Sequence, residues 1–221
     1  MNTNSIQTGP AIIVAGVIVA IAILITNSPK TEVKTTEQAP TTLAFNLKDP
    51  NEHVLGSVDA KIVMVEYSDI DCPFCRRFHP VMEQIVKDYD GEVAWVYRHF
   101  PLEGLHPDAL AKARATECVS AALGNDAFWN YTNTLFTTDV SIDKLDDEAV
   151  KIGMSSDDFK TCMNSTAPDE AVQADIQSGI ALGTKGTPNT IIVNSKGEQE
   201  IVQGAADYAS VKAKIDKLLA K

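Results

Sequence analysis

The stretch DIDCPFCRRFHP, from Asp69 to Pro80, contains two cysteines, Cys72 and Cys75, with two residues between them. Such a pair can be half of a zinc site, a structural disulfide or a redox centre. The run KIVMVEY (61–67) before it is mostly apolar and predicts a buried strand. The residues that follow, to about Tyr89, have the apolar spacing of a helix. The cysteine pair therefore lies where a strand gives way to a helix.

This position favours redox chemistry. The N-terminus of a helix presents unpaired N–H groups and the positive end of the helix dipole, which stabilise an anion. A thiolate is the nucleophile in disulfide exchange, so Cys72 is placed to be activated. Pro73 suits the first turn, where its missing N–H costs nothing. Cys75 lies one turn further on, so the pattern predicts that Cys72 attacks and Cys75 resolves the mixed disulfide.

A zinc site is a poor alternative for this pair. Structural zinc requires four ligands, which commonly come from two such pairs. The other two cysteines, Cys118 and Cys162, lie far apart in the chain on separate predicted helices, and the four histidines are scattered. We therefore expect neither a metal nor a prosthetic group.

The remainder of the folded region continues as strands and helices. A second strand is predicted at 92–100, which gives a strand–helix–strand unit with parallel strands. From 106 to about 183 the pattern is helical. Residues 187–194 and 198–204 then predict a hairpin, and a final helix follows at 207–219.

Four features at matching spacing make the chain resemble the thioredoxin superfamily, and within it the DsbA-like thiol-disulfide oxidoreductases. One feature is the Cys-x-x-Cys after the first core strand. The others are Glu66 before the first cysteine, Pro80 after the second, and Thr187-Pro188 before the hairpin. The resemblance covers roughly residues 50–221. It implies an α/β thioredoxin fold (βαβ–ββα) with an all-helical insertion at about 105–183.

The resemblance also implies roles for individual residues. Glu66 would be a buried acid that passes a proton to or from Cys75 through water, because burial raises the pKa of a carboxyl group. Pro188 would be a cis-proline that holds the backbone of Thr187 ready to pair with an extended substrate. Phe74 lies between the cysteines, at the position that tunes redox potential, and brings no charge. It would belong to the apolar face that binds substrate. The alternatives are a solvent-facing Glu66 on an edge strand and an ordinary trans-proline at 188.

Charged residues flank the cysteine pair on both sides. Arg76 and Arg77 would add some anion stabilisation near Cys72, whereas Asp69 and Asp71 would oppose it. We expect all four to be solvated surface charges, with little influence on the thiols.

The two remaining cysteines are expected to form a structural bridge. Cys118 and Cys162 fall on two helices of the insertion, and some DsbA-like relatives carry a disulfide in this region. The alternative is a pair of buried free thiols. A structural disulfide indicates a compartment outside the cytoplasm.

The N-terminal region predicts a membrane anchor. Residues 11–26, AIIVAGVIVAIAILIT, contain no charge, and the run becomes long enough to span a bilayer when it is extended to 10–27. A cleaved signal peptide is the alternative, but no Lys or Arg precedes Lys30 and no clear cleavage site is present. Lys30 and Lys34 after the span weakly favour a cytoplasmic domain. The expected disulfide and the resemblance outweigh them, which places the domain outside and the N-terminus inside.

The chain of 221 residues is long enough for one domain and an attachment. We divide it into a tail at 1–9, the anchor at 10–27, a flexible linker at 28–42 and a thioredoxin-fold domain at 43–221. The linker is rich in Thr, Pro and charge, with little to bury.

These features predict an extracytoplasmic enzyme that oxidises cysteine pairs in exported proteins. Its expected partners are reduced or unfolded exported chains and a quinone-linked membrane reoxidase of the DsbB or VKOR type. The net charge of −11 argues against nucleic acid as a partner. Two alternatives use the same fold: a disulfide reductase or isomerase, and a thioredoxin-like module that binds without catalysis.

Overall fold

The computed structural model describes residues 46–221. The anchor predicted at 10–27 and most of the linker predicted at 28–42 therefore remain predictions, because both segments lie outside the described residues. No helix within 46–221 combines the length and the apolar character that crossing a membrane requires.

A five-stranded mixed sheet forms the centre of the described domain, with the strand order β1-β3-β2-β4-β5. The strands are β1 (His53–Gly56), β2 (Ile62–Ser68), β3 (Val93–His99), β4 (Asn189–Asn194) and β5 (Gln199–Gln203). β2 and β3 are parallel, as the strand–helix–strand pattern predicted, and β4 and β5 form the predicted antiparallel hairpin. β1, which was not predicted, pairs antiparallel with β3 at the edge of the sheet.

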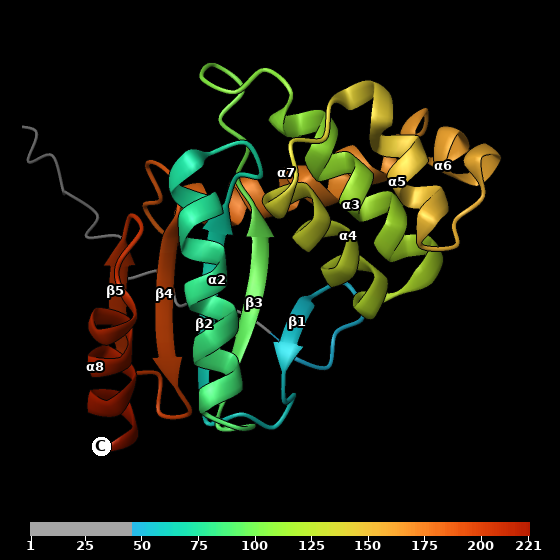
Figure 1. Ribbon diagram of the computed structural model, residues 1–221. Coiled ribbons are helices and arrows are strands. Elements are labelled where there is room, and N and C mark those ends of the chain that lie inside the picture. The colour runs from blue at the N-terminus through green and yellow to red at the C-terminus, as the bar shows by residue number, and fades with distance from the viewer. Residues whose placement is uncertain (1–45) are drawn as a thin grey trace, which may run out of the picture. The chain divides into compact units, whose positions relative to one another are not determined.

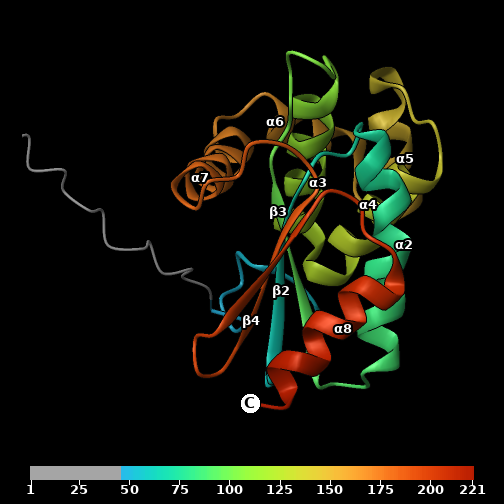
Figure 2. The same ribbon diagram turned by 90° about the vertical axis from the view of Figure 1, so that its left-hand side faces the viewer.

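Helices connect the strands and cover both faces of the sheet. The helices are α2 (Pro73–Asp88), α3 (Ala109–Leu123), α4 (Asn125–Thr137), α5 (Leu145–Lys151), α6 (Ser156–Met163), α7 (Ala167–Ala181) and α8 (Tyr208–Leu219), with a 3₁₀ turn at Ile142–Lys144. α2 joins β2 to β3, and α3 to α7 follow one another between β3 and β4 (Figure 1). Figure 2 shows α2 and α8 on one face of the sheet and α7 on the other.

The side chains on the two faces of β2 pack into two different cores, and this alternation decides which way Glu66 points. Ile62 and Met64 belong to the core shared with α2 and α8, whereas Val63 and Val65 belong to a second core beneath α7. Alternate residues of a strand point to opposite faces. Glu66 is therefore on the same face as Ile62 and Met64, the face that α2 covers.

The apolar spacing of α2 fixes how this helix lies on the sheet. Its buried positions Cys75, Phe78, Met82 and Ile85 recur every three or four residues, so they form one stripe that packs into the core. Pro80 lies within the helix on the exposed side. The stripe begins at Cys75, which places that thiol under the helix and against the sheet.

Candidate active site

The two cysteines of the Cys-Pro-Phe-Cys stretch occupy different environments at the start of α2. Cys72 is the N-cap residue with an extended backbone (φ −68°, ψ 121°), and both cysteines are free thiols. The Sγ of Cys72 lies 3.5 Å from the carbonyl oxygen of Thr187. The Sγ of Cys75 accepts a hydrogen bond of 3.5 Å from the backbone N–H of Asp69. Cys72 thus faces the segment before the hairpin, and Cys75 faces the core.

These environments separate the pKa values of the two thiols. A hydrogen bond from the Cys75 thiol lowers the pKa of Cys72 to about 5, helped by the backbone N–H groups of Cys75 and Phe74 and opposed by burial. Burial raises the pKa of Cys75, and the hydrogen bond to Cys72 raises it further. Cys72 is the thiolate at neutral pH and can attack a disulfide, whereas Cys75 holds its proton.

Glu66 is buried in a central strand beneath the active-site helix. Its side chain is 1% exposed, and its neighbours in the sheet are Tyr97 on β3 and Thr190 on β4. The alternative of a solvent-facing glutamate on an edge strand is therefore wrong. Burial raises the pKa of Glu66 to about 8, and the Oε2 atom has no hydrogen-bond partner among residues 46–221. The charge of Glu66 in turn raises the pKa of Cys75.

A buried carboxyl group with this pKa can hold or release a proton near neutral pH. The group shares the α2 face of the sheet with the resolving cysteine, which is where a proton must arrive or leave when the disulfide opens or closes. This arrangement suits the predicted role of Glu66 in proton transfer to or from Cys75.

The peptide bond between Thr187 and Pro188 is cis, so the alternative of a trans-proline is wrong. A groove of about 440 Å³ lies beside this bond. Its lining consists of the residues around the bond and the facing end of the hairpin: Gly183, Lys185, Gly186, Thr187, Pro188, Asn189, Gln203 and Gly204. The groove thus adjoins the segment whose backbone meets Cys72.

Asp69 differs from the expectation that it is a solvated surface charge. It is 1% exposed, and its Oδ2 atom accepts hydrogen bonds of 2.8 Å from the N–H of Leu102 and from Nδ1 of His106. Asp71 is half-buried and pairs with the ammonium group of Lys112. The two aspartates therefore fasten the loop after β3 and the start of α3 to the active-site turn. The local sequence gave no sign of this, because their partners come from segments beyond β3.

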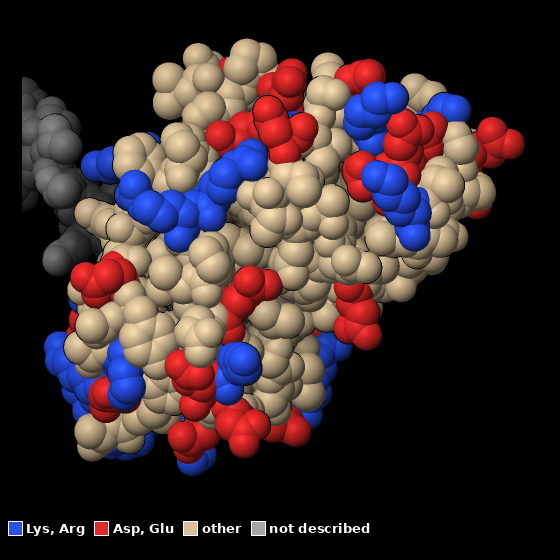
Figure 3. Space-filling view, viewed as in Figure 1, with Lys and Arg blue, Asp and Glu red and all other residues tan. Residues whose placement is uncertain are grey.

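The surface around the cysteines is apolar and positively charged. Phe74 and Leu105 are large apolar side chains that are 53% and 74% exposed. The guanidinium group of Arg77 lies 5.1 Å from the centre of the Phe74 ring, and Arg76 donates a hydrogen bond of 3.4 Å to the carbonyl of Thr138. Figure 3 shows Lys and Arg side chains gathered over the N-terminal part of α2.

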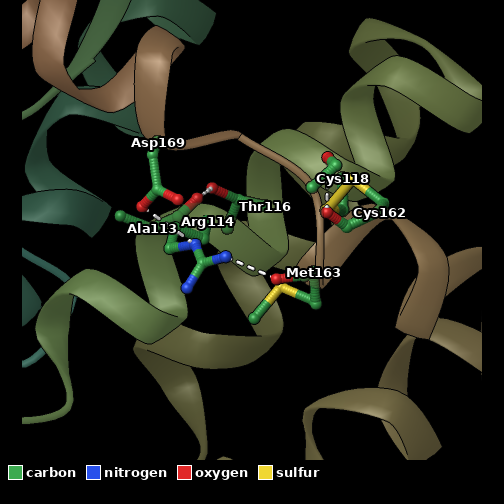
Figure 4. The surroundings of a disulfide bond; sticks show 8 residues. Ala113, Arg114, Thr116, Cys118, Cys162, Met163 and Asp169 are labelled. Atoms are coloured by element: carbon green, nitrogen blue, oxygen red, sulfur yellow. Dashed lines mark hydrogen bonds and ion pairs between the residues drawn. A yellow bond between two sulfur atoms is a disulfide. The ribbon is translucent and has the colours of Figure 1, made fainter. Parts of the chain in front are cut away.

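The disulfide between Cys118 and Cys162 is present, with an S–S distance of 1.99 Å and a Cα–Cα distance of 5.7 Å. It joins α3 to α6 within the helical part of the domain (Figure 4). Close to it, Arg114 donates to the carbonyl of Met163 and lies 3.1 Å from Oδ1 of Asp169. The bridge thus belongs to a set of contacts that hold the helices together, apart from the Cys72 site.

The sequence suggested that the four histidines are scattered, but two of them lie together in the structure. His53 and His99 lie beside each other and share a contact with Glu117. The strand that carries His53 was not predicted, so its position next to β3 was not expected. This cluster contains no residue of the cysteine site.

Comparison with known proteins gives the family. A family model described as Thioredoxin matches residues 48–217. The chain belongs to the thioredoxin family. Among solved structures, the catalytic domain of Proteus mirabilis ScsC superposes with a TM-score of 0.65 and 26% identity over 79% of this chain and 92% of that chain. For Wolbachia pipientis alpha-DsbA1 the TM-score is 0.67 and the identity 24%, over 77% of this chain and 92% of that chain.

The fold of this thioredoxin-family chain is thus that of the DsbA-like proteins. Together with the two free cysteines at the start of α2, membership of the thioredoxin family makes the chain a thiol-disulfide oxidoreductase. The predicted thioredoxin fold and enzyme class are confirmed, and the transmembrane helix predicted before the fold stays a prediction.

The curated relatives are of a different kind. The Na(+)/H(+) antiporter NhaA 1 of Mycolicibacterium gilvum is 35% identical over 153 residues, which is 67% of this chain and 24% of the antiporter. Similar proteins from other bacteria match over comparable shares. The chain spans about a quarter of the length of the curated relatives it matches.

Proposed function

We propose that this thioredoxin-family chain is a membrane-anchored, extracytoplasmic oxidase that introduces disulfides into exported proteins. The observation that carries the proposal is the position of the Cys72 sulfur, which the N-terminus of α2 and the thiol of Cys75 stabilise as a thiolate. A thiolate exists only in the reduced pair. Stabilising it favours the reduced form, which makes the disulfide form a strong oxidant.

The reaction consists of two thiol-disulfide exchanges. A client thiolate attacks Sγ of Cys72 in the oxidised enzyme, forms a mixed disulfide and expels the sulfur of Cys75. The leaving sulfur takes a proton, for which the buried carboxyl group of Glu66 is placed. A second client thiolate then attacks the client sulfur and releases Cys72 as a thiolate. The client has lost two electrons and gained a disulfide, and the enzyme has gained the two electrons.

Substrate binding would use the groove beside the cis-proline. An extended client segment can pair with the backbone of Thr187, which lies 3.5 Å from Sγ of Cys72. Phe74 and Leu105 offer apolar contacts to the side chains of an unfolded chain. Backbone pairing and apolar contact require no particular client sequence, which suits an enzyme with many clients.

Location at the membrane is supported by three features. The apolar segment at 10–27 is long enough to anchor the chain, and the Cys118–Cys162 disulfide favours an oxidising compartment. In addition, the matched relatives are named as antiporters, which move ions across membranes, so the segment similar to this chain is there part of a membrane protein. A quinone-linked membrane partner of the DsbB or VKOR type would then reoxidise the Cys72–Cys75 pair.

The deciding measurement is the reduction potential of the Cys72–Cys75 pair. The full-length chain in detergent is equilibrated with glutathione buffers, and the fraction of oxidised pair is read from alkylation of the free thiols. We expect a value toward the oxidising end of the superfamily, at about −120 mV, where DsbA lies. A value near that of thioredoxin, about −270 mV, would assign a reductase instead.

Two further experiments test the oxidase and its location. The oxidised chain should form a disulfide in a reduced model peptide, and Cys72→Ser should abolish this activity. A Cys72→Ser variant as active as the wild type would mean that catalysis does not proceed through this pair. In intact cells, a membrane-impermeant maleimide should label Cys72 after mild reduction, and failure to label it would contradict an extracytoplasmic domain.

A further inference from the structure

A cluster of two histidines and one glutamate lies outside the cysteine site. His53 begins β1, His99 ends β3 and Glu117 is on α3. Both imidazole rings are almost fully buried, and the Glu117 side chain is 13% exposed. Each of the three residues offers one ligand atom, and these atoms all lie within 4.8 Å of one another.

The fold itself brings the two rings together. In the antiparallel pair of β1 and β3, His53 is opposite Tyr97, so His99 is two residues along on the same face. The ring of His53 stacks on Phe128, with centroids 3.6 Å apart and an interplanar angle of 4°. The ring of His99 packs edge-to-face against the same phenyl group, with ring centroids 6.0 Å apart. Packing against Phe128 thus fixes the direction of both rings.

The ligand atoms converge on one point. Nε2 of His53 lies 2.6 Å from Oε1 of Glu117, and Nε2 of His99 lies 3.1 Å from the same oxygen. Ligand atoms bound at about 2.0–2.2 Å in a tetrahedron are about 3.3–3.6 Å apart, so small shifts would open room for an ion.

The surroundings favour a cation. A cavity of about 940 Å³ reaches the cluster, and its lining includes the acidic residues Asp49, Glu52, Glu117, Glu170 and Asp175. Arg98 is the only Lys or Arg in that lining, and it is engaged by Glu52 at 2.5 Å. The negative charges therefore exceed the fixed positive charges around the two imidazole rings.

We propose that His53, His99 and Glu117 form a binding site for one divalent transition metal ion of the zinc type. Two imidazole nitrogens and one carboxylate oxygen are a ligand set that Zn²⁺ takes, with the fourth position left to a solvent molecule or a small ligand from the cavity. A bound ion would connect the edge strand β1, the strand β3 and the helix α3 that carries Cys118. This inference is independent of the direction of electron flow at Cys72.

The test uses the full-length chain in detergent, with Cys72 and Cys75 oxidised so that neither thiol can bind metal. After treatment with a chelator, the protein is titrated with Zn²⁺ against a chromophoric competitor, and bound zinc is counted by elemental analysis. We expect one Zn²⁺ per chain and a melting temperature that rises with the Zn²⁺ concentration. Co²⁺ in place of Zn²⁺ should give the visible absorption bands of a four-coordinate ion.

Single substitutions assign the site. His53→Gln, His99→Gln and Glu117→Gln should each weaken Zn²⁺ binding at least about tenfold. His106→Gln, which removes an imidazole elsewhere, should bind as the wild type does. Circular dichroism and urea unfolding show whether each variant is folded.

Two results would overturn the proposal. One is a wild-type chain that binds no stoichiometric Zn²⁺ and gives no four-coordinate Co²⁺ spectrum, which would leave the cluster as a buried carboxylate shared by two imidazoles. The other is a folded His99→Gln or Glu117→Gln variant that binds as tightly as the wild type. If the variants fail to fold, the wild-type Co²⁺ spectrum decides between the two readings.

Discussion

Replacing Glu66 by Gln should remove a pH dependence from the stability of the fold. Burial raises the pKa of Glu66 from 4.5 to about 8. Between these values the folded chain keeps a proton that the unfolded chain has released. A rise in pH therefore favours the unfolded chain, and the free energy of unfolding falls by about 1.4 kcal/mol per pH unit from this group alone.

The expected size follows from the same two values. From pH 4.5 to pH 7 the unfavourable contribution of Glu66 grows to about 3 kcal/mol, and it stops growing above about pH 8, where both states are ionised. A glutamine does not titrate. Between pH 4.5 and pH 7, the free energy of unfolding of Glu66→Gln should therefore rise by about 3 kcal/mol relative to that of the wild type. Any fixed cost of placing an amide in the core shifts the whole curve and leaves this difference unchanged.

The assay is urea unfolding of the full-length chain in detergent, followed by the fluorescence of the buried Trp95 and Trp129 at several pH values. The Cys72–Cys75 pair is kept oxidised, so neither thiol titrates. Glu103→Gln, an exposed glutamate on the loop after β3, is the matched control and should run parallel to the wild type.

A stability difference between Glu66→Gln and the wild type that stays constant from pH 5 to pH 7 would refute the reasoning. It would mean that the carboxyl group is not held protonated, and the proton-transfer role would lose its basis. If the difference changes as expected, the same variant should also oxidise the peptide more slowly, because the leaving sulfur of Cys75 loses its nearby acid.

The remaining predictions concern the four cysteines. The ultraviolet thiolate absorbance of the reduced chain should rise with a midpoint near pH 5 and disappear in Cys72→Ser; a thiolate that forms only above neutral pH would contradict the assignment of Cys72. Cys75→Ala should accumulate mixed disulfides through Cys72 in cells, and their absence would count against client oxidation. Removing the bridge with Cys118→Ser and Cys162→Ser should lower the free energy of unfolding by about 3–4 kcal/mol for a separation of 44 residues, and an unchanged urea midpoint would contradict this.

The parts of the fold that the sequence predicted are those with a long periodic pattern or a fixed motif. The apolar run of β2 and the stripe of α2 are both long enough to show their period, and the cysteines mark the junction between them. β1 has four residues, too few for an alternating pattern to stand out. It forms because β3 offers an edge for antiparallel pairing, and that is a property of the assembled sheet.

The same distinction applies to the site. Cys72, Cys75 and Thr187-Pro188 are recognisable because the chemistry needs those residue types at fixed spacing. Asp69 is not, because its carboxylate is buried by a loop that comes from the far side of β3. The pairing of His53 with His99 depends on the register of β1 against β3, which no local pattern records.

The difference between the two thiols follows from helix geometry. Cys72 at the N-cap and Cys75 in the first turn are three positions apart; the sulfur of Cys72 lies beside the carbonyl of Thr187, and Cys75 belongs to the buried stripe that faces the sheet. Phe74 lies between them and points outward, with 53% of its surface exposed. A substitution there changes the surface that a client meets, whereas Glu66 stays buried beneath the helix. Because the thiols of Cys72 and Cys75 share a hydrogen bond, a change in the pKa of Cys72 also affects Cys75.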